Sequence, residues 1–171
     1  MVQQWNSVVQ PQDHVYHLGD VAMQRQHLSI VKRLQGHKRL VRGNHDIFKT
    51  KEYLVAGFKE IHGMRVIEQV VLTHCPMHSQ CLGRFIGNVH GHLHQNPSPP
   101  GRYLNVCVEP LQYTPIALED AIENLKAKQE ELTTLGKEQK CCNRTLVYEG
   151  TSGSIEHYRC PSCHRAYWWA K

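Results

Sequence analysis

Four short clusters of polar residues stand out in the chain, because each falls at or just beyond the end of an apolar run. Their side chains offer carboxylate, amide and imidazole donors, which suit manganese, iron and zinc. Two such cations about 3.5 to 4 Å apart lower the pKa of a shared water and clamp the oxygens of a phosphate ester. This pattern therefore favours metal-assisted hydrolysis without a protein nucleophile. The clusters are Gly19-Asp20, Gly43-Asn44-His45-Asp46, Thr73-His74 and His90-Gly91-His92-Leu93-His94.

The segments around these clusters alternate between strand and helix patterns. Residues 14–18 and 38–42 are short apolar runs typical of strands, and the apolar residues of 23–34 suit one face of a helix. This predicts a βαβ unit, and therefore an α/β sheet with more antiparallel strands later in the chain. The ligands of such a sheet lie beyond the carboxyl ends of its strands. A second helical stretch and three further strands are expected at 47–58, 69–73, 86–90 and 103–108.

In this order the clusters resemble the metal-binding motifs of the calcineurin-like metallophosphoesterase superfamily, which run G-D, G-N-H-D/E, H and G-H-x-H. The match spans roughly residues 14–118. The resemblance implies a layered α/β sandwich and a hydrolase that cleaves phosphomonoesters or phosphodiesters with a metal-activated hydroxide. It also implies divalent ions such as Mn, Fe, Zn or Ni. The family begins with a D-x-H on its first strand, and nothing before Asp20 supplies that motif.

The same resemblance assigns roles to single residues. One metal would take Asp20, Asn44, His74 and His92, so that site is complete. The other would take the D-x-H pair, the shared aspartate and the last histidine, of which Asp20 and His94 remain. His45 would donate a proton to the leaving alkoxide, with Asp46 holding its other ring nitrogen.

Several of these residues also have plainer interpretations. Gly43-Asn44 favours a simple turn when taken alone. His90 could replace a missing ligand if extended backbone continued through Gly91, or it could be structural. Cys75 could approach the metal, or it could be a small apolar residue like Cys81 and Cys107.

The amino-terminal residues fit the last turns of an amphipathic helix that ends before Pro11. A helix in this architecture normally follows a strand. We therefore expect the chain to begin inside its first βα unit, where the D-x-H strand belongs. A late start codon, a fragmentary gene or a deliberate truncation would each produce this. The apolar residues of the expected helix are Val2, Trp5, Val8 and Val9.

The last 31 residues carry a second signal, because they hold four of the seven cysteines. Cys160-Pro161-Ser162-Cys163 has the spacing of a zinc knuckle, and adjacent Cys141 and Cys142 precede it at a distance typical of a zinc ribbon. A ribbon expects a C-x-x-C in both halves. Water, His157 or His164 could therefore replace one ligand, or both adjacent cysteines could bind with strain. Segments 145–148 and 156–159 are expected to form a hairpin.

Aromatic and cationic residues accompany these cysteines. They could stack on bases or meet a phosphate backbone, or the aromatic rings could simply build the core of a small module. A metal-free appendage is the alternative to structural zinc. The residues concerned are Tyr158, Tyr167, Trp168 and Trp169, with Arg144, Arg159, Arg165 and Lys171.

Three parts are expected: a metallophosphoesterase core at 1–116, a helical linker at 117–139 and a zinc-ribbon-like module at 140–171. Residues 117–135 place one apolar stripe among Glu, Lys and Gln. This predicts a helix packed on the core, and self-association through a coiled coil is the alternative.

The composition agrees with a globular chain of 171 residues that is 40% hydrophobic and 20% charged. The chain has no apolar run of about 18 residues and no secretory signal, which predicts a cytoplasmic protein without a membrane partner. A net charge of +5 suits an anionic phosphate-ester substrate but does not establish nucleic-acid binding. The alternative function is a noncatalytic protein that binds nucleic acid or protein through a degenerate phosphoesterase core.

Overall fold

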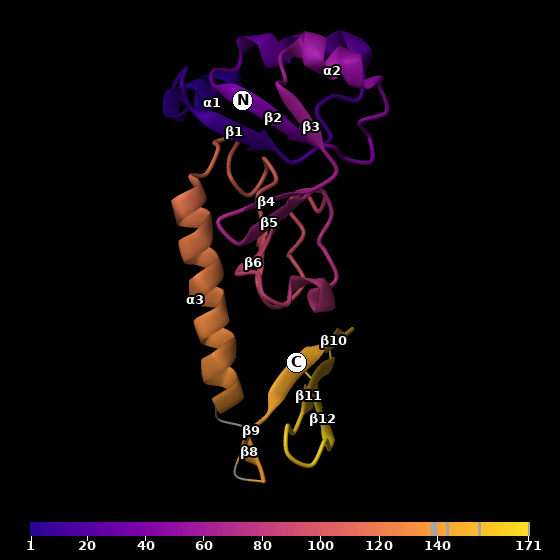
Figure 1. Ribbon diagram of the computed structural model, residues 1–171, viewed down its shortest axis with the longest axis vertical. Coiled ribbons are helices and arrows are strands. Elements are labelled where there is room, and N and C mark those ends of the chain that lie inside the picture. The colour runs from indigo at the N-terminus through magenta and orange to yellow at the C-terminus, as the bar shows by residue number, and fades with distance from the viewer. Residues whose placement is uncertain (138–139, 143, 154, 171) are drawn as a thin grey trace.

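The computed structural model describes residues 1–137, 140–142, 144–153 and 155–170, without the side chains of 131–137, 140 and 167–170. It is a mixed α/β protein with several sheets and few helices (Figure 1). The first sheet contains three parallel strands in the order β1-β2-β3. They are β1 (His14–His17), β2 (His37–Val41) and β3 (Glu60–His62).

Parallel neighbours require crossover connections, and two short helices supply them. The first is a 3-10 helix, η1 (Arg25–Arg33), and the second is α2 (Thr50–Ala56). The sequence predicted an ordinary helix at 23–34, and that prediction was wrong about the helix type. The segment has no side-chain cap and no acidic residue in its first turn, and it contains β-branched Ile30 and Val31.

The second sheet has the order β4-β5-β6-β7. Its first pair is antiparallel and the other two pairs are parallel. This mixture agrees with the expectation of more antiparallel pairing later in the chain. The strands are β4 (Arg65–Ile67), β5 (Val70–Thr73), β6 (Gly87–His90) and β7 (Tyr103–Asn105), with the 3-10 helix η2 (Ser79–Leu82) between β5 and β6.

Strand β1 separates two apolar clusters, because successive side chains of a strand point to opposite faces. Val15 packs with Trp5 and Val9, beside the amino-terminal helix α1 (Val2–Val8). Tyr16 and Leu18 pack against the cluster that joins both sheets. The predicted amino-terminal helix is therefore present, and the indole N–H of Trp5 ties it to the rest of the fold by donating to the carbonyl of Gln35 at 3.0 Å.

The longest helix, α3 (Leu118–Lys137), runs beside the second sheet (Figure 1). Ala121 and Leu125 are buried in the cluster that joins the sheets. Lys128 donates a hydrogen bond of 2.7 Å to the carbonyl of Tyr103 in β7. The first half of the helix therefore packs on the core as expected, and self-association stays a prediction.

Beyond α3, the residues that the structure describes form strands and turns. β8 (Lys140–Cys141) pairs with β9 (Arg144–Thr145), and the predicted hairpin is present as antiparallel β10 (Val147–Ser152) and β11 (Ile155–Arg159). A third strand, β12 (Ala166–Ala170), pairs with β11 and was not predicted. In the part of the chain that the structure describes, the helices are too short or too polar to cross a membrane.

Candidate metal centre

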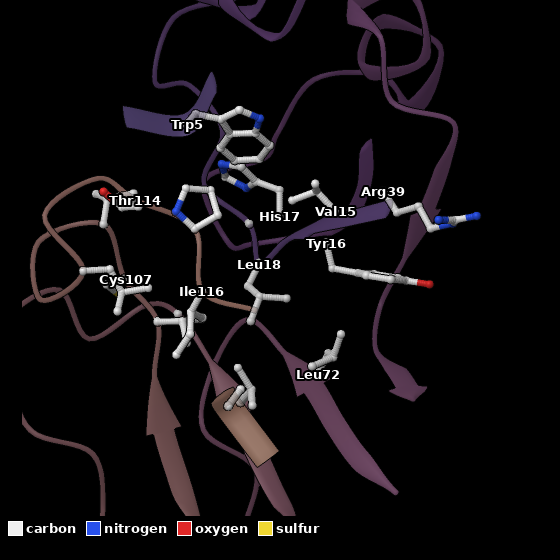
Figure 2. Close-up of a pocket in the computed structure, with 18 of the residues that line it drawn as sticks. Trp5, Val15, Tyr16, His17, Leu18, Arg39, Leu72, Cys107, Thr114 and Ile116 are labelled. Carbon is white, nitrogen blue, oxygen red and sulfur yellow. The ribbon is translucent and has the colours of Figure 1, made fainter. Parts of the chain in front are cut away.

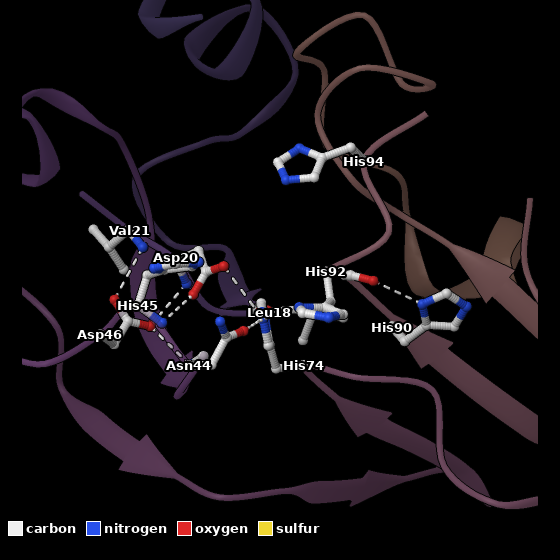
Figure 3. Close-up of polar contacts among 12 residues, drawn as sticks. Leu18, Asp20, Val21, Asn44, His45, Asp46, His74, His90, His92 and His94 are labelled. Carbon is white, nitrogen blue, oxygen red and sulfur yellow. Dashed lines mark hydrogen bonds and ion pairs between the residues drawn. The ribbon is translucent and has the colours of Figure 1, made fainter. Parts of the chain in front are cut away.

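The predicted ligands of one metal lie just beyond the carboxyl ends of strands from both sheets. Asp20 follows β1 and Asn44 follows β2, whereas His74 and His92 follow β5 and β6. Figure 3 shows their side chains pointing toward one another across the space between the sheets. The structure therefore brings together the four residues that the resemblance groups as ligands of one metal.

His74 stands at the centre of this group. Its Nε2 lies 2.8 Å from Oδ1 of Asn44, 3.1 Å from Nδ1 of His92 and 3.3 Å from Oδ2 of Asp20. Ligand atoms that surround one ion at about 2.0 to 2.2 Å are themselves separated by roughly 3 Å. The three donor atoms around Nε2 of His74 therefore lie at distances typical of neighbouring ligands of one ion.

The protonation of His74 supports the same interpretation. Its Nδ1 lies 2.7 Å from the carbonyl oxygen of Leu18, which can only accept a hydrogen bond. Nδ1 must therefore carry the proton, and in a neutral ring Nε2 presents a lone pair. That lone pair faces the oxygens of Asn44 and Asp20, which are also acceptors. A cation at this point would convert the repulsion into coordination, so the donor set fits a divalent metal.

Glycines allow the loops to approach His74 this closely. A Cβ built on Gly19 would lie 2.5 Å from Nδ1 of His74, and one built on Gly43 would lie 2.6 Å from the backbone nitrogen of Asp20. Real Cβ contacts of this length essentially do not occur. The glycines before Asp20 and Asn44 are therefore a steric requirement of the centre as well as part of a turn.

Asp46 is buried below the ligands, where it organises their backbone. Its carboxylate accepts hydrogen bonds of 2.8, 3.0 and 2.8 Å from the backbone N–H groups of Asp20, Val21 and Gly43. We expected this carboxylate to hold the His45 ring, but the structure commits it to these amides. Asp46 is therefore a positioning residue, which ties the loop after β1 to the loop after β2.

His45 lies beside the ligands with an exposed side chain. Its backbone N–H donates a 2.9 Å hydrogen bond to Oδ1 of Asp20. This contact leaves the other carboxylate oxygen of Asp20 directed at His74. His45 is thus fixed through its backbone at the edge of the centre, while its imidazole faces solvent.

His94 lies apart from the four ligands, as Figure 3 shows. Its side chain is 63% exposed, and its Nδ1 lies 2.7 Å from Oε1 of Glu109. The hydrogen bond from His94 lowers the pKa of Glu109. When one ring nitrogen donates its N–H to a carboxylate, the other nitrogen presents a lone pair that can bind a metal, which is the usual arrangement of a metal-binding histidine. His94 therefore has the hydrogen bonding of a metal ligand, but it lies outside the cluster.

His90 is structural. It is fully buried, its Nδ1 lies 2.8 Å from the carbonyl oxygen of Gly91, and its Nε2 lies 2.9 Å from the hydroxyl of Ser98. Both ring nitrogens are used within the protein. The hypothesis that His90 replaces a missing ligand is therefore not supported, because the backbone turns away after β6.

A cavity of about 990 Å³ extends from the metal centre along β1, and Figure 2 shows its lining. Residues from both faces of β1 border it, so the cavity follows the edge of this strand. Among the described residues, β1 pairs only with β2, so this edge has no strand partner. The cavity is bordered along β1 by Val15, Tyr16, His17 and Leu18, and at one end by Asp20, His74, His92 and His94.

Two further polar groups border this cavity, and the sequence patterns gave neither of them a role. Nδ1 of His17 and Oε2 of Glu109 are buried without a hydrogen-bond partner. Burial lowers the pKa of His17 and keeps its ring neutral. His17 could have been found from its position on the strand that leads to Asp20. No sequence motif pointed to Glu109, because only the folding of the chain brings it next to His94.

A second group of metal donors lies in the tail. The sulfurs of Cys141, Cys142, Cys160 and Cys163 all lie within 4.8 Å of one another. The Cys141 sulfur is 3.8 Å from that of Cys142 and 3.6 Å from that of Cys163. Four thiolates at about 2.3 Å from a zinc ion are separated by about 3.8 Å. The adjacent cysteines therefore both join the cluster, and Cys142 adopts a left-handed φ of 53° to do so.

The charges in the cysteine cluster are unevenly shared. A hydrogen bond from the backbone of Arg165 lowers the pKa of Cys163 to about 7, whereas hydrogen bonding to Cys163 raises the pKa of Cys142 to about 12. One sulfur thus carries negative charge while its neighbour keeps a proton. A divalent cation would replace that proton, which is how thiolate sites bind zinc.

Aromatic rings surround the cysteines as a small core. Tyr158 is buried with Leu146 and Cys160, and its ring meets that of Tyr148 at 5.2 Å between centroids. For Tyr158, this supports the interpretation of the aromatic residues as core. The side chains of Tyr167, Trp168 and Trp169, and all of Lys171, lie outside the described residues.

We predict that Gly43→Ala weakens divalent-metal binding by at least about tenfold, since even contacts outside the ligand sphere are worth this much. The added methyl group displaces the Asp20 carboxylate. Isothermal titration with Mn²⁺ measures the change. Gly63→Ala is the matched control, because a Cβ there meets no atom within 4 Å. Equal affinities for the two variants would contradict the packing argument.

We also predict that replacing Cys160 and Cys163 with serine releases the tail metal and unfolds residues 140–170 while the core stays folded. So short a module buries little apolar surface, and its metal-binding energy is its folding energy. Hydrogen exchange followed by mass spectrometry compares both regions, with Cys81→Ser as the control. A tail that stays protected without losing zinc would show that these cysteines are merely packed thiols.

Comparison with known proteins gives one relative and no established activity. No protein-family model matches the chain, and no solved structure matches it significantly. A curated protein of Methanocaldococcus jannaschii, described as "Uncharacterized protein MJ1445", is 30% identical over 146 residues, which cover 79% of this chain and 78% of the archaeal protein. The chain therefore belongs to the same family as this archaeal protein.

Proposed function

We propose that the protein is a metal-dependent phosphoesterase. The observation that carries this proposal is that Asn44, His92 and Asp20 place donor atoms 2.8, 3.1 and 3.3 Å from Nε2 of His74. The order of the clusters resembles that of the calcineurin-like superfamily, whose layered sandwich agrees with two sheets meeting at a shared polar edge. The basic net charge suits an anionic substrate.

A bound divalent cation would supply Lewis-acid polarisation of the phosphoryl oxygens and lower the pKa of a water molecule. The chain's own residues provide the remaining functions. Asp46 holds the Asp20 and Asn44 loops together through three backbone amides. His45 projects into solvent beside the ligands, where its imidazole donates a hydrogen bond and then a proton to the leaving oxygen.

The cavity beside β1 lies where the second metal of the superfamily would bind. It follows an edge of β1 that has no strand partner among the described residues. It also reaches Asp20 and His94, which would both bind that metal. An additional strand carrying D-x-H in this cavity would add the two donors that the site lacks. The orphan Nδ1 of His17 and the Glu109 carboxylate on His94 support a polar occupant at this end.

The cysteine cluster is proposed to hold structural zinc. Its four sulfurs match the donor number and spacing of a closed tetrahedral site, which leaves no open position for substrate. Manganese, iron, zinc and nickel all fit the Asp20 centre by donor type, because it offers oxygen and imidazole nitrogen.

One observation favours a second candidate function. His94 is mostly exposed and lies outside the cluster, so the described residues gather the donors of only one ion around His74, besides the cysteine cluster. A noncatalytic protein that binds nucleic acid or protein would need no second site. The metal and activity measurements below separate the two functions.

We predict that the chain binds close to one divalent ion per molecule at Asp20, Asn44, His74 and His92, besides the tail metal. Metal analysis after chelation and reconstitution with Mn²⁺ measures the ratio. His74→Ala should abolish this binding because the central donor is lost, whereas His27→Ala, an exposed histidine on η1, should retain it. Two tightly held ions at this centre, or none, would contradict the assignment.

We further predict weak hydrolysis of a nitrophenyl phosphodiester, raised by orders of magnitude when an upstream D-x-H strand is fused to the chain. The second cation contributes charge stabilisation worth several kcal/mol. The matched control is the same strand with its Asp and His replaced by Asn and Ala, which fills the cavity without adding ligands. Equal rates for the chain with and without the D-x-H strand would refute the two-metal proposal.

A further inference from the structure

Cys75 lies next to the metal centre at a position that the ligand assignment does not use. Its sulfur, a ring nitrogen of His74 and a ring nitrogen of His92 all lie within 4.8 Å of one another. Both histidines are residues assigned above as ligands. The sulfur is therefore grouped with the coordination sphere itself rather than with a distant part of the loop.

The backbone holds Cys75 in this place. The hydroxyl of Thr73 donates a 2.6 Å hydrogen bond to the carbonyl of Cys75, and the backbone N–H of Gly91 donates a 2.9 Å bond to the carbonyl of His74. These bonds fix the turn immediately after β5 against the loop after β6. A rotation of the Cys75 side chain is then enough to vary the distance between its sulfur and the ring nitrogens.

The required adjustment is small. Sulfur at about 2.3 Å and nitrogen at about 2.1 Å from one ion, with ligand angles of about 90° to 120°, are separated by roughly 3.1 to 3.8 Å. The Cys75 side chain is exposed, so its neighbours do not oppose such a rotation. Coordination displaces the thiol proton to solvent, because a bound cation favours the thiolate.

We propose that Cys75 is a thiolate ligand of the ion held by Asp20, Asn44, His74 and His92. This inference rests on the proposed function and specifies its metal. A soft sulfur donor selects zinc or iron over manganese and magnesium, which prefer oxygen. The centre is then a mixed oxygen, nitrogen and sulfur site, and its resident ion is a borderline-soft metal.

Cobalt(II) tests this ligand, because thiolate bound to cobalt gives a charge-transfer band that oxygen and nitrogen donors do not give. The full chain is loaded at the tail with zinc and then titrated with Co²⁺. Cys75→Ser should lose the band and weaken cobalt and zinc binding by at least about tenfold, while Mn²⁺ binding changes less. Cys81→Ser, which removes another exposed thiol, is the matched control and should keep the band.

Alkylation supplies a second measurement that does not depend on a substitution. Iodoacetamide labelling with mass-spectrometric mapping should show Cys75 protected when zinc fills the centre, while Cys81 in the same molecule labels equally with and without zinc. An unchanged band in Cys75→Ser, or equal labelling of Cys75, would overturn the inference and leave the phosphoesterase proposal standing. Failure of the unaltered chain to bind any ion at His74 would overturn both.

Discussion

The structure depends most on the close contact of the loops around the His74 ring. This ring donates to the carbonyl of Leu18 after β1 and meets Asn44 after β2 and His92 after β6. One side chain of the second sheet is thus hydrogen-bonded to one loop of the first and in close contact with another. Because Gly19 and Gly43 lack side chains, the backbones approach closely enough for these contacts to form. The contacts of the His74 ring therefore determine both how the two sheets are placed and how the side chains of the centre are arranged.

Much of the strand arrangement was predictable, because short apolar runs followed by polar residues are a local signal. Strands β1, β2, β5 and β6 lie where the runs predicted them, and each ligand follows its strand. Helical segments were less predictable. Residues 25–33 lack a cap and form a 3-10 helix, and α2 begins three residues later than expected, at Thr50. These differences arise because the pairing of the neighbouring strands, more than local propensity, determines the conformation of a short connection.

The site was predictable where it depends on residue type and order, and not where it depends on contacts between distant segments. Asp20, Asn44, His74 and His92 were found from their motifs, but the Asp46 carboxylate bonds to backbone amides whose positions no sequence pattern specifies. His94 pairs with Glu109, which lies beyond β7. In the tail, the left-handed conformation of Cys142 allows two adjacent cysteines to serve one cluster. That solution was one of several compatible with the sequence.

Asp20 at φ 55° and His92 at φ 68° in the centre, and His94 at φ 51° beside it, occupy the left-handed region of backbone conformation. For L-residues this conformation costs roughly 1 to 2 kcal/mol each, and glycine or asparagine would reduce that cost. If the proposed ion gave no selective advantage, sequence drift would therefore favour glycine or asparagine at these three positions. Retention of Asp and His there in other members of the family would argue that the side chains themselves are under selection.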